Sequence, residues 1–233
     1  MSANGNQSHG VAPDFESARR EMVTHQIRDR GIHSPRVLQA MQSVERHLFV
    51  PSEQASRAYA DEPLPIGEGQ TISQPFMVAA MADALSLAGH ERVLEIGAGS
   101  GYQAAVISLL ARDVIAVEAQ PLLAASARER LARLGYLNVR VEVGDGSLGW
   151  PAEAPYDAIL VTAAAPAVPP PLLEQLAEAG RLVIPVGSAD QQELLRIVKR
   201  GGTTAQQSLY ACRFVPLLGR HGWRGPTQEP NRG

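Results

Sequence analysis

Residues 92–111, "RVLEIGAGSGYQAAVISLLA", combine two kinds of apolar pattern around a run of glycines. The short run up to the first glycine predicts a buried strand, and the longer stretch after the glycines predicts a helix. Gly97, Gly99 and Gly101 form a G-x-G-x-G loop between the two. Because glycine lets the backbone turn sharply and approach a ligand closely, this stretch predicts a strand–helix unit with a ligand at the strand end.

The same alternation continues to the C-terminus. Near-continuous apolar strands that alternate with helices predict an α/β fold, with a doubly wound parallel sheet covered on both faces. Right-handed crossovers then bring the carboxyl ends of the strands to one edge, where ligands bind. We expect strands at 92–97, 113–119, 139–145, 156–164 and 181–187, helices at 102–111, 121–135 and 170–180, and a final antiparallel pair at 193–200 and 208–217.

Residues 14–50 predict helices that precede this core. Asp14 and Ser34 are typical N-cap residues, Pro35 suits a first helical turn, and Gly31 suits a helix end. We expect one domain over 1–233, with a disordered tail at 1–12, N-terminal helices and an active-site loop at 14–90, an α/β core at 91–218 and a flexible tail at 219–233.

The composition bounds the setting of the protein. A net charge of −3 gives no electrostatic case for a nucleic-acid partner. The single cysteine, Cys212, excludes an internal disulfide and favours a reducing compartment. We find no signal peptide, no membrane-spanning run and no histidine spacing typical of a metal site. We therefore expect a cytoplasmic protein with no nucleic-acid or membrane partner and no metal, and we take a monomer as the default.

Acidic residues near the glycine loop indicate which cofactor it binds. Glu118 ends the second strand, where a carboxylate can accept both ribose hydroxyls of an adenosine cofactor. Glu95, just before the loop, would repel a pyrophosphate and attract a positively charged cofactor such as S-adenosylmethionine. Asp145, next to Gly146 at the third strand end, can bind the adenine amino group, and Ser100 suits a cofactor contact. A nicotinamide oxidoreductase stays an alternative.

Several longer segments resemble protein-L-isoaspartate O-methyltransferases. They include "VLEIGAGSGYQAAV", "GDGSLGWPAEAPYDAILVTAA", "GRLVIPVG", "GQTISQP" and "RFVPLLG", and the resemblance runs from about residue 20 to 219. The resemblance implies a Rossmann-like class I S-adenosylmethionine-dependent methyltransferase with an N-terminal helical extension. It implies protein repair: methyl transfer to the free α-carboxylate of L-isoaspartyl residues in damaged proteins, with D-aspartyl residues as a second candidate.

The uncharged stretch "GQTISQP" matches the part of the family that meets the substrate. The resemblance implies that Ser73 contacts the substrate carboxylate, that Thr71 and Ile72 line the cofactor, and that Val215 borders the peptide groove. The chemistry agrees, because a carboxylate acceptor is already ionised at neutral pH and needs no general base. Neutral donors can align it for in-line displacement without damping its nucleophilicity, as an arginine or lysine would. Read without the resemblance, Ser73 is an ordinary N-cap of the helix that Pro75 begins, and we expect this helix to end at Gly89 as its C′ residue.

Two further classes of function remain open at this point. One is a methyltransferase that acts on a small molecule or on RNA, although the weak net charge argues against RNA. The other is a protein that binds S-adenosylmethionine without catalysis.

Overall fold

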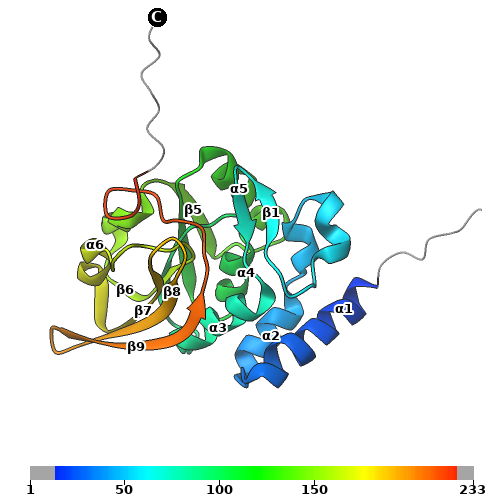
Figure 1. Ribbon diagram of the computed structural model, residues 1–233, viewed down its shortest axis with the longest axis horizontal. Coiled ribbons are helices and arrows are strands. Elements are labelled where there is room, and N and C mark those ends of the chain that lie inside the picture. The colour runs from blue at the N-terminus through cyan, green and yellow to red at the C-terminus, as the bar shows by residue number, and fades with distance from the viewer. Residues whose placement is uncertain (1–13, 225–233) are drawn as a thin grey trace, which may run out of the picture.

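The computed structural model describes residues 14–224 and is built around a seven-stranded sheet of order β5-β4-β3-β6-β7-β8-β9 (Figure 1). Neighbouring strands from β5 to β7 are parallel, and β8 and β9 extend the sheet with antiparallel pairings. The chain order reverses beside β3, which is where doubly wound sheets bind their ligands. The strands are β3 (Arg92–Ile96), β4 (Asp113–Glu118), β5 (Val139–Val143), β6 (Tyr156–Val161), β7 (Leu176–Gly187), β8 (Gln192–Arg200) and β9 (Thr203–Cys212).

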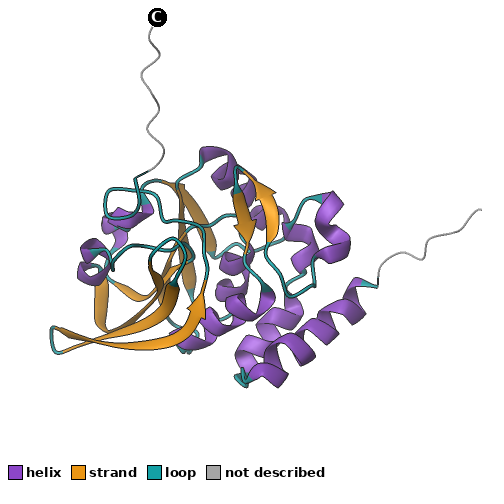
Figure 2. Cartoon of the chain, viewed as in Figure 1, coloured by secondary structure: helices purple, strands orange, loops and turns teal. Residues whose placement is uncertain are grey.

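Helices cover both faces of this sheet, as Figure 2 shows by colour. On β3, Val93 packs into the apolar cluster that includes residues of α3, α4 and α5, whereas Leu94 and Ile96 pack into the cluster on the α6 side. This alternation buries both faces and confirms the predicted doubly wound α/β class. The helices of the core are α3 (Pro75–Leu85), α4 (Tyr102–Ser108), α5 (Pro121–Arg133) and α6 (Pro170–Glu174).

The N-terminal extension is helical, as expected. Asp14 caps α1, because its Oδ1 accepts a hydrogen bond of 3.0 Å from the Ser17 amide. Gly31 ends the first helical run in the left-handed region, with φ +102°. Ser34 precedes α2 but makes no side-chain cap. The extension comprises α1 (Phe15–Glu21), a π-helical stretch Met22–Ile27, a 3-10 turn Arg28–Arg30, α2 (Pro35–Ser43) and 3-10 turns at Arg46–Phe49 and Ser52–Arg57, followed by the hairpin β1 (Leu64–Gly67) and β2 (Gln70–Ile72).

The helix predicted at 170–180 is wrong beyond its first turn. Helix α6 ends at Glu174, and β7 begins at Leu176, which pairs with Tyr156 of β6. The carbonyl of Gln175 accepts a 2.9 Å bond from the Tyr156 amide, and the Gln175 side chain accepts one of 2.8 Å from the Trp150 amide. These contacts draw the segment into the sheet, so tertiary pairing overrides its helical preference.

Helix α3 also ends earlier than the expected stop at Gly89. Its last residue is Leu85, and Ser86 adopts the left-handed conformation with φ +51°. Arg181 of β7 donates a 2.8 Å bond to the Leu85 carbonyl, which satisfies one of the free acceptors at the helix end. The end of α3 is therefore stabilised by an arginine that is distant in the sequence, and the helix does not extend to the nearby glycine.

Ordered structure continues past the predicted end of the core at residue 218. The amide of Arg220 donates to Asp145 Oδ2 at 2.8 Å, and the indole of Trp223 donates to the Ala164 carbonyl at 3.1 Å. The expected flexible tail is therefore wrong for 219–224, whose turn is anchored by these bonds. The rest of both predicted tails, 1–12 and 225–233, lies outside the described residues.

Candidate active site

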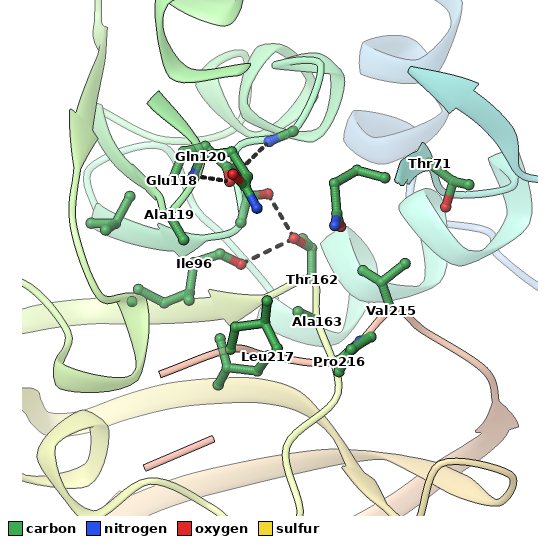
Figure 3. A pocket seen from close by; sticks show the side chains of 16 residues that line it. Thr71, Ile96, Glu118, Ala119, Gln120, Thr162, Ala163, Val215, Pro216 and Leu217 are labelled. Atoms are coloured by element: carbon green, nitrogen blue, oxygen red, sulfur yellow. Dashed lines mark hydrogen bonds between the residues drawn. The ribbon is translucent and has the colours of Figure 1, made fainter. Parts of the chain in front are cut away.

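Three adjoining spaces lie at the carboxyl edge of β3, β4 and β6. The main cavity, shown in Figure 3, is lined by Glu118, Val215 and the end of β3. A smaller pocket lies beside it, and a broader groove runs towards β9. The smaller one, called the rear pocket below, is lined among others by Ile72, Ser100 and Gln103, and the groove by Gln74, Met77 and Phe214. Thr71 and Thr162 line all three spaces, so the main cavity and the groove meet at these two hydroxyl side chains.

The glycine loop has the shape that its sequence predicts. Gly97 has φ +96°, and a Cβ placed on it would lie 2.5 Å from Thr162 Oγ1. Gly97 and Gly99 line the main cavity, while Gly101 lies at the start of α4, where an added Cβ would be 3.1 Å from Leu131. Two glycines therefore give backbone access to the cavity, and the third lets α4 pack closely against α5.

Glu118 joins the glycine loop to the end of β4. Its Oε2 accepts a 2.8 Å bond from the Gly99 amide, and its Oε1 accepts a 3.0 Å bond from the Gln120 amide (Figure 3). The side chain is 6% exposed and lines the main cavity. Each carboxylate oxygen has room for a second hydrogen bond, which is what the vicinal hydroxyls of a ribose would use.

Thr162 is a site residue that the sequence analysis missed. It follows β6, and its Oγ1 lies 2.7 Å from the Gly97 carbonyl and 3.0 Å from the Ile96 carbonyl (Figure 3). Its amide also donates to Ile96 at 2.9 Å. The signal was the hydroxyl at the end of a predicted strand, but only the pairing of β6 with β3 places it against the glycine loop.

Glu95 lies on β3, two residues before Gly97, with no exposed surface. Neither of its carboxylate oxygens has a hydrogen-bond partner among the described residues. Burial, together with the nearby charge of Glu118, raises the pKa of Glu95 well above its usual value. Glu95 lines none of the three spaces, so its expected contact with the cofactor stays a prediction.

Asp145 and Gly146, the two cofactor contacts predicted at the end of the third strand, lie differently relative to the main cavity. Gly146 lines the main cavity and packs so closely that an added Cβ would lie 2.3 Å from Ile96 Cγ2. The Asp145 carboxylate does not line it. Its Oδ1 accepts a 2.9 Å bond from the Ser147 amide, and its Oδ2 accepts one of 2.8 Å from the Arg220 amide. The predicted adenine contact of Asp145 therefore competes with bonds that anchor the C-terminal turn.

Thr71 and Ile72 end β2 of the hairpin, Ser73 follows them before α3, and this segment lines the three spaces. Ile72, Ser73 and Ser100 line the rear pocket, and Ser73 also lines the groove. The N-cap position of α3 belongs to Gln74, and no hydrogen bond to Ser73 Oγ occurs among residues 14–224. The hydroxyl of Ser73 therefore does not cap α3 and is free to bind a ligand.

Val215 stands between the main cavity and the groove and lines both. Its carbonyl accepts a 2.8 Å bond from the Ala164 amide, which ties the segment after β9 to the end of β6. The position fits the predicted border between the cofactor and the peptide groove.

A glycine loop after the central strand, a carboxylate at the next strand end and a cavity that opens into a second groove fit a class I S-adenosylmethionine-dependent methyltransferase. Residues 17–222 match the profile of the family described as Protein-L-isoaspartate(D-aspartate) O-methyltransferase. The chain belongs to this protein-L-isoaspartate(D-aspartate) O-methyltransferase family. The resemblance and enzyme class expected from the sequence are thereby confirmed, against the nicotinamide oxidoreductase alternative.

Individual relatives agree over nearly their full lengths. The chain is 56% identical to a protein-L-isoaspartate O-methyltransferase of Methanoculleus marisnigri over 207 residues, which is 89% of this chain and 94% of the relative. It is 57% identical to one of Roseiflexus castenholzii over 210 residues, 90% of this chain and 96% of the relative.

Solved structures show the same fold. A protein-L-isoaspartate O-methyltransferase superposes with a TM-score of 0.80 at 30% identity, over 88% of this chain and 67% of the other. A Plasmodium falciparum structure described as a protein-L-isoaspartate O-methyltransferase beta-aspartate methyltransferase (PCMT), in complex with S-adenosyl-L-homocysteine, gives a TM-score of 0.73 at 26% identity, over 89% and 99% of the two chains.

Proposed function

We propose that the chain transfers the methyl group of S-adenosylmethionine to the free α-carboxylate of L-isoaspartyl residues in damaged proteins and peptides, with D-aspartyl residues as a second acceptor. The observation that carries the proposal is the junction of the main cavity and the groove at Thr71 and Thr162, with Ser73 beside it. A donor in the cavity and a peptide in the groove would meet there.

The residues of the main cavity suit an adenosine-bearing donor. Glu118 offers acceptors for ribose hydroxyls, and the close approach of Gly97 and Gly146 to their neighbours leaves backbone surface where side chains would obstruct. Leu217 and Pro216 give the cavity an apolar wall. When bound, the donor supplies an electrophilic methyl group on a positively charged sulfur.

Ser73 is proposed to hold the acceptor. A carboxylate is ionised at neutral pH, so the protein needs to align it and not to remove a proton. The Ser73 hydroxyl can donate one hydrogen bond to a carboxylate oxygen and leave the other oxygen free to attack. Because the hydroxyl is neutral, it orients the carboxylate nucleophile without neutralising its negative charge.

The test compares paired isoaspartyl and aspartyl peptides of one sequence with methyl-labelled S-adenosylmethionine. We expect label on the isoaspartyl peptide alone. Label on both peptides equally, or on neither, would contradict the proposed substrate, and label on a small molecule instead would favour a different methyltransferase.

Ser73→Ala isolates the role of the hydroxyl. We expect kcat/KM for the isoaspartyl peptide to fall about tenfold or more, because a charge-assisted hydrogen bond is lost, while S-adenosylhomocysteine binds with unchanged Kd. Ser43→Ala on α2 is the matched control, since Ser43 bonds only its own helix at the Gln39 carbonyl. A collapse of cofactor affinity in Ser73→Ala would refute the assigned role.

The setting of the enzyme is also a proposal. We propose a cytoplasmic monomer that has no nucleic-acid or membrane partner. The net charge of −3 supports the absence of a nucleic-acid partner, and the single cysteine supports a reducing compartment. No helix within residues 14–224 is long and apolar enough to cross a bilayer. Light scattering coupled to size-exclusion chromatography measures the oligomeric state, and a dimer mass would contradict the monomer.

A further inference from the structure

The side chains that line the groove within residues 14–224 carry positive charge and no negative charge. Among its lining residues in the described part of the chain, Arg213 is the one charged side chain, and neither Asp nor Glu is among them. The rest of the lining is apolar or neutral, and includes Ser73 and Gln74 before α3, Met77 on α3 and Phe214 after β9. A groove of this kind attracts anionic and repels cationic ligands.

Arg213 has no internal partner to neutralise it. It is exposed directly after β9, and no ion pair or side-chain hydrogen bond of Arg213 occurs among residues 14–224. Other arginines near the sheet are engaged, such as Arg196, which donates a 2.7 Å bond to the Ala84 carbonyl. The charge of Arg213 is therefore available to a ligand in the groove.

The backbone that carries Arg213 is firmly held. The buried Gln192 side chain accepts a 2.7 Å bond from the Phe214 amide through Oε1 and donates one of 3.4 Å to the Phe214 carbonyl through Nε2. One residue further, Val215 is bonded to Ala164 at 2.8 Å. The backbone next to Arg213 is thus held in place, so a ligand that binds the guanidinium need order only its side chain and not the segment that carries it.

The reacting carboxylate is not the best partner for this arginine. Ser73 follows β2, whereas Arg213 follows β9, and a guanidinium in contact with the acceptor would reduce its nucleophilicity. An exposed arginine at a rim instead suits a second carboxylate on the same peptide.

We propose that Arg213 is a specificity-determining residue that favours damaged peptides carrying Asp or Glu close to the isoaspartyl residue and disfavours those carrying Lys or Arg there. The proposal rests on the function proposed above, because it presumes that the groove holds an isoaspartyl peptide.

The test uses isoaspartyl peptides that differ at a single flanking position, which holds Glu, Gln or Lys. Each of the two positions on either side of the isoaspartyl residue is varied in turn. With the wild-type protein we expect kcat/KM to fall from Glu to Gln to Lys, by about two- to fivefold per step, as for an exposed ion pair. The preference shrinks at high salt, because screening weakens such pairs.

Variants assign the preference to Arg213. Arg213→Gln should make the three peptides equivalent, Arg213→Glu should reverse the order, and Arg213→Lys should retain it. Arg200→Gln is the matched control: it removes one exposed positive charge at the end of β8, where Arg200 pairs with Thr203 at the start of β9, and the wild-type order should persist.

Two results would overturn the inference: equal kcat/KM for all peptides with the wild type, or a preference that survives in Arg213→Gln. If none of these peptides is methylated by the wild type, the proposed function itself fails. If they are methylated without regard to charge, only the role of Arg213 fails.

Discussion

Two loops meet at the active edge of the sheet, and they are built differently. The glycine loop, residues 97–101, is held from three directions. Gly99 donates to Glu118 at 2.8 Å, Gly97 donates to the Val117 carbonyl at 2.8 Å, and Arg130 donates to the Ser100 carbonyl at 2.8 Å. The part of the site that would bind the methyl donor thus has its conformation fixed before any ligand binds.

The hydroxyl segment, residues 70–74, is held much less. Strand β2 pairs only with β1, and the Ser73 hydroxyl has no hydrogen bond among the described residues. Since the groove is open, water can satisfy this hydroxyl until a carboxylate replaces it. The contrast indicates that the cofactor binds to a loop whose conformation is already fixed. The acceptor would instead bind to a hydroxyl group that has no hydrogen bond within the described residues.

The largest expected effect comes from breaking the prebuilt loop. Gly97→Ala places a Cβ 2.5 Å from Thr162 Oγ1 at φ +96°, so steric clash adds to left-handed strain. We expect the Kd of S-adenosylhomocysteine to rise about 30-fold or more, measured by calorimetry. Gly69→Ala in the hairpin is the control: its φ is +68°, but nothing lies within 4 Å of the added Cβ. An equal loss of cofactor affinity in both variants would refute the contrast between the loops.

A second effect concerns the buried acid below the glycine loop. Because burial and then Glu118 raise the pKa of Glu95 in the folded state, the folded protein keeps a proton that the unfolded chain loses above about pH 4.3. Stability therefore falls as pH rises from there until the folded pKa is reached, by about 1.4 kcal/mol per pH unit.

Glu95→Gln removes this dependence. We expect the free energy of unfolding of the variant, relative to wild type, to increase from pH 5 to pH 7, measured by urea denaturation without cofactor. Glu129→Gln on the exposed side of α5 serves as the control and should track the wild type. Parallel curves for Glu95→Gln and wild type would show that Glu95 is ionised in the folded protein.

The smallest effect tests Thr162, which bonds the glycine loop and lines both the main cavity and the groove. Thr162→Val removes the hydroxyl that lies 2.7 Å from the Gly97 carbonyl while keeping the side-chain shape. We expect cofactor affinity to fall about fivefold, the value of one typical hydrogen bond, and Thr162→Ser to restore most of it. If Thr162→Val binds the cofactor as tightly as the wild type, the hydrogen bond from the Thr162 hydroxyl to the glycine loop does not contribute to cofactor affinity.

The sequence predicted the parts of the site that depend on local signals. The glycine loop, Glu118 at the strand end and Ser73 beside the helix start all lie at the active edge as expected. It failed where long-range contacts decide. Thr162 gains its role from the pairing of β6 with β3, and the Asp145 carboxylate is engaged by the distant Arg220 amide.

By itself, the sequence determined the order of strands and helices, the family and the backbone freedom of the glycine loop, because apolar periodicity and the lack of a side chain act within a few residues. Only the tertiary structure decided that residues 176–180 enter β7, that Glu95 is buried without a hydrogen-bond partner among the described residues, and that Arg213 and Ser73 line one groove. Each of these outcomes depends on which distant segments meet, and the free energy of such contacts exceeds the weak local preferences of the chain.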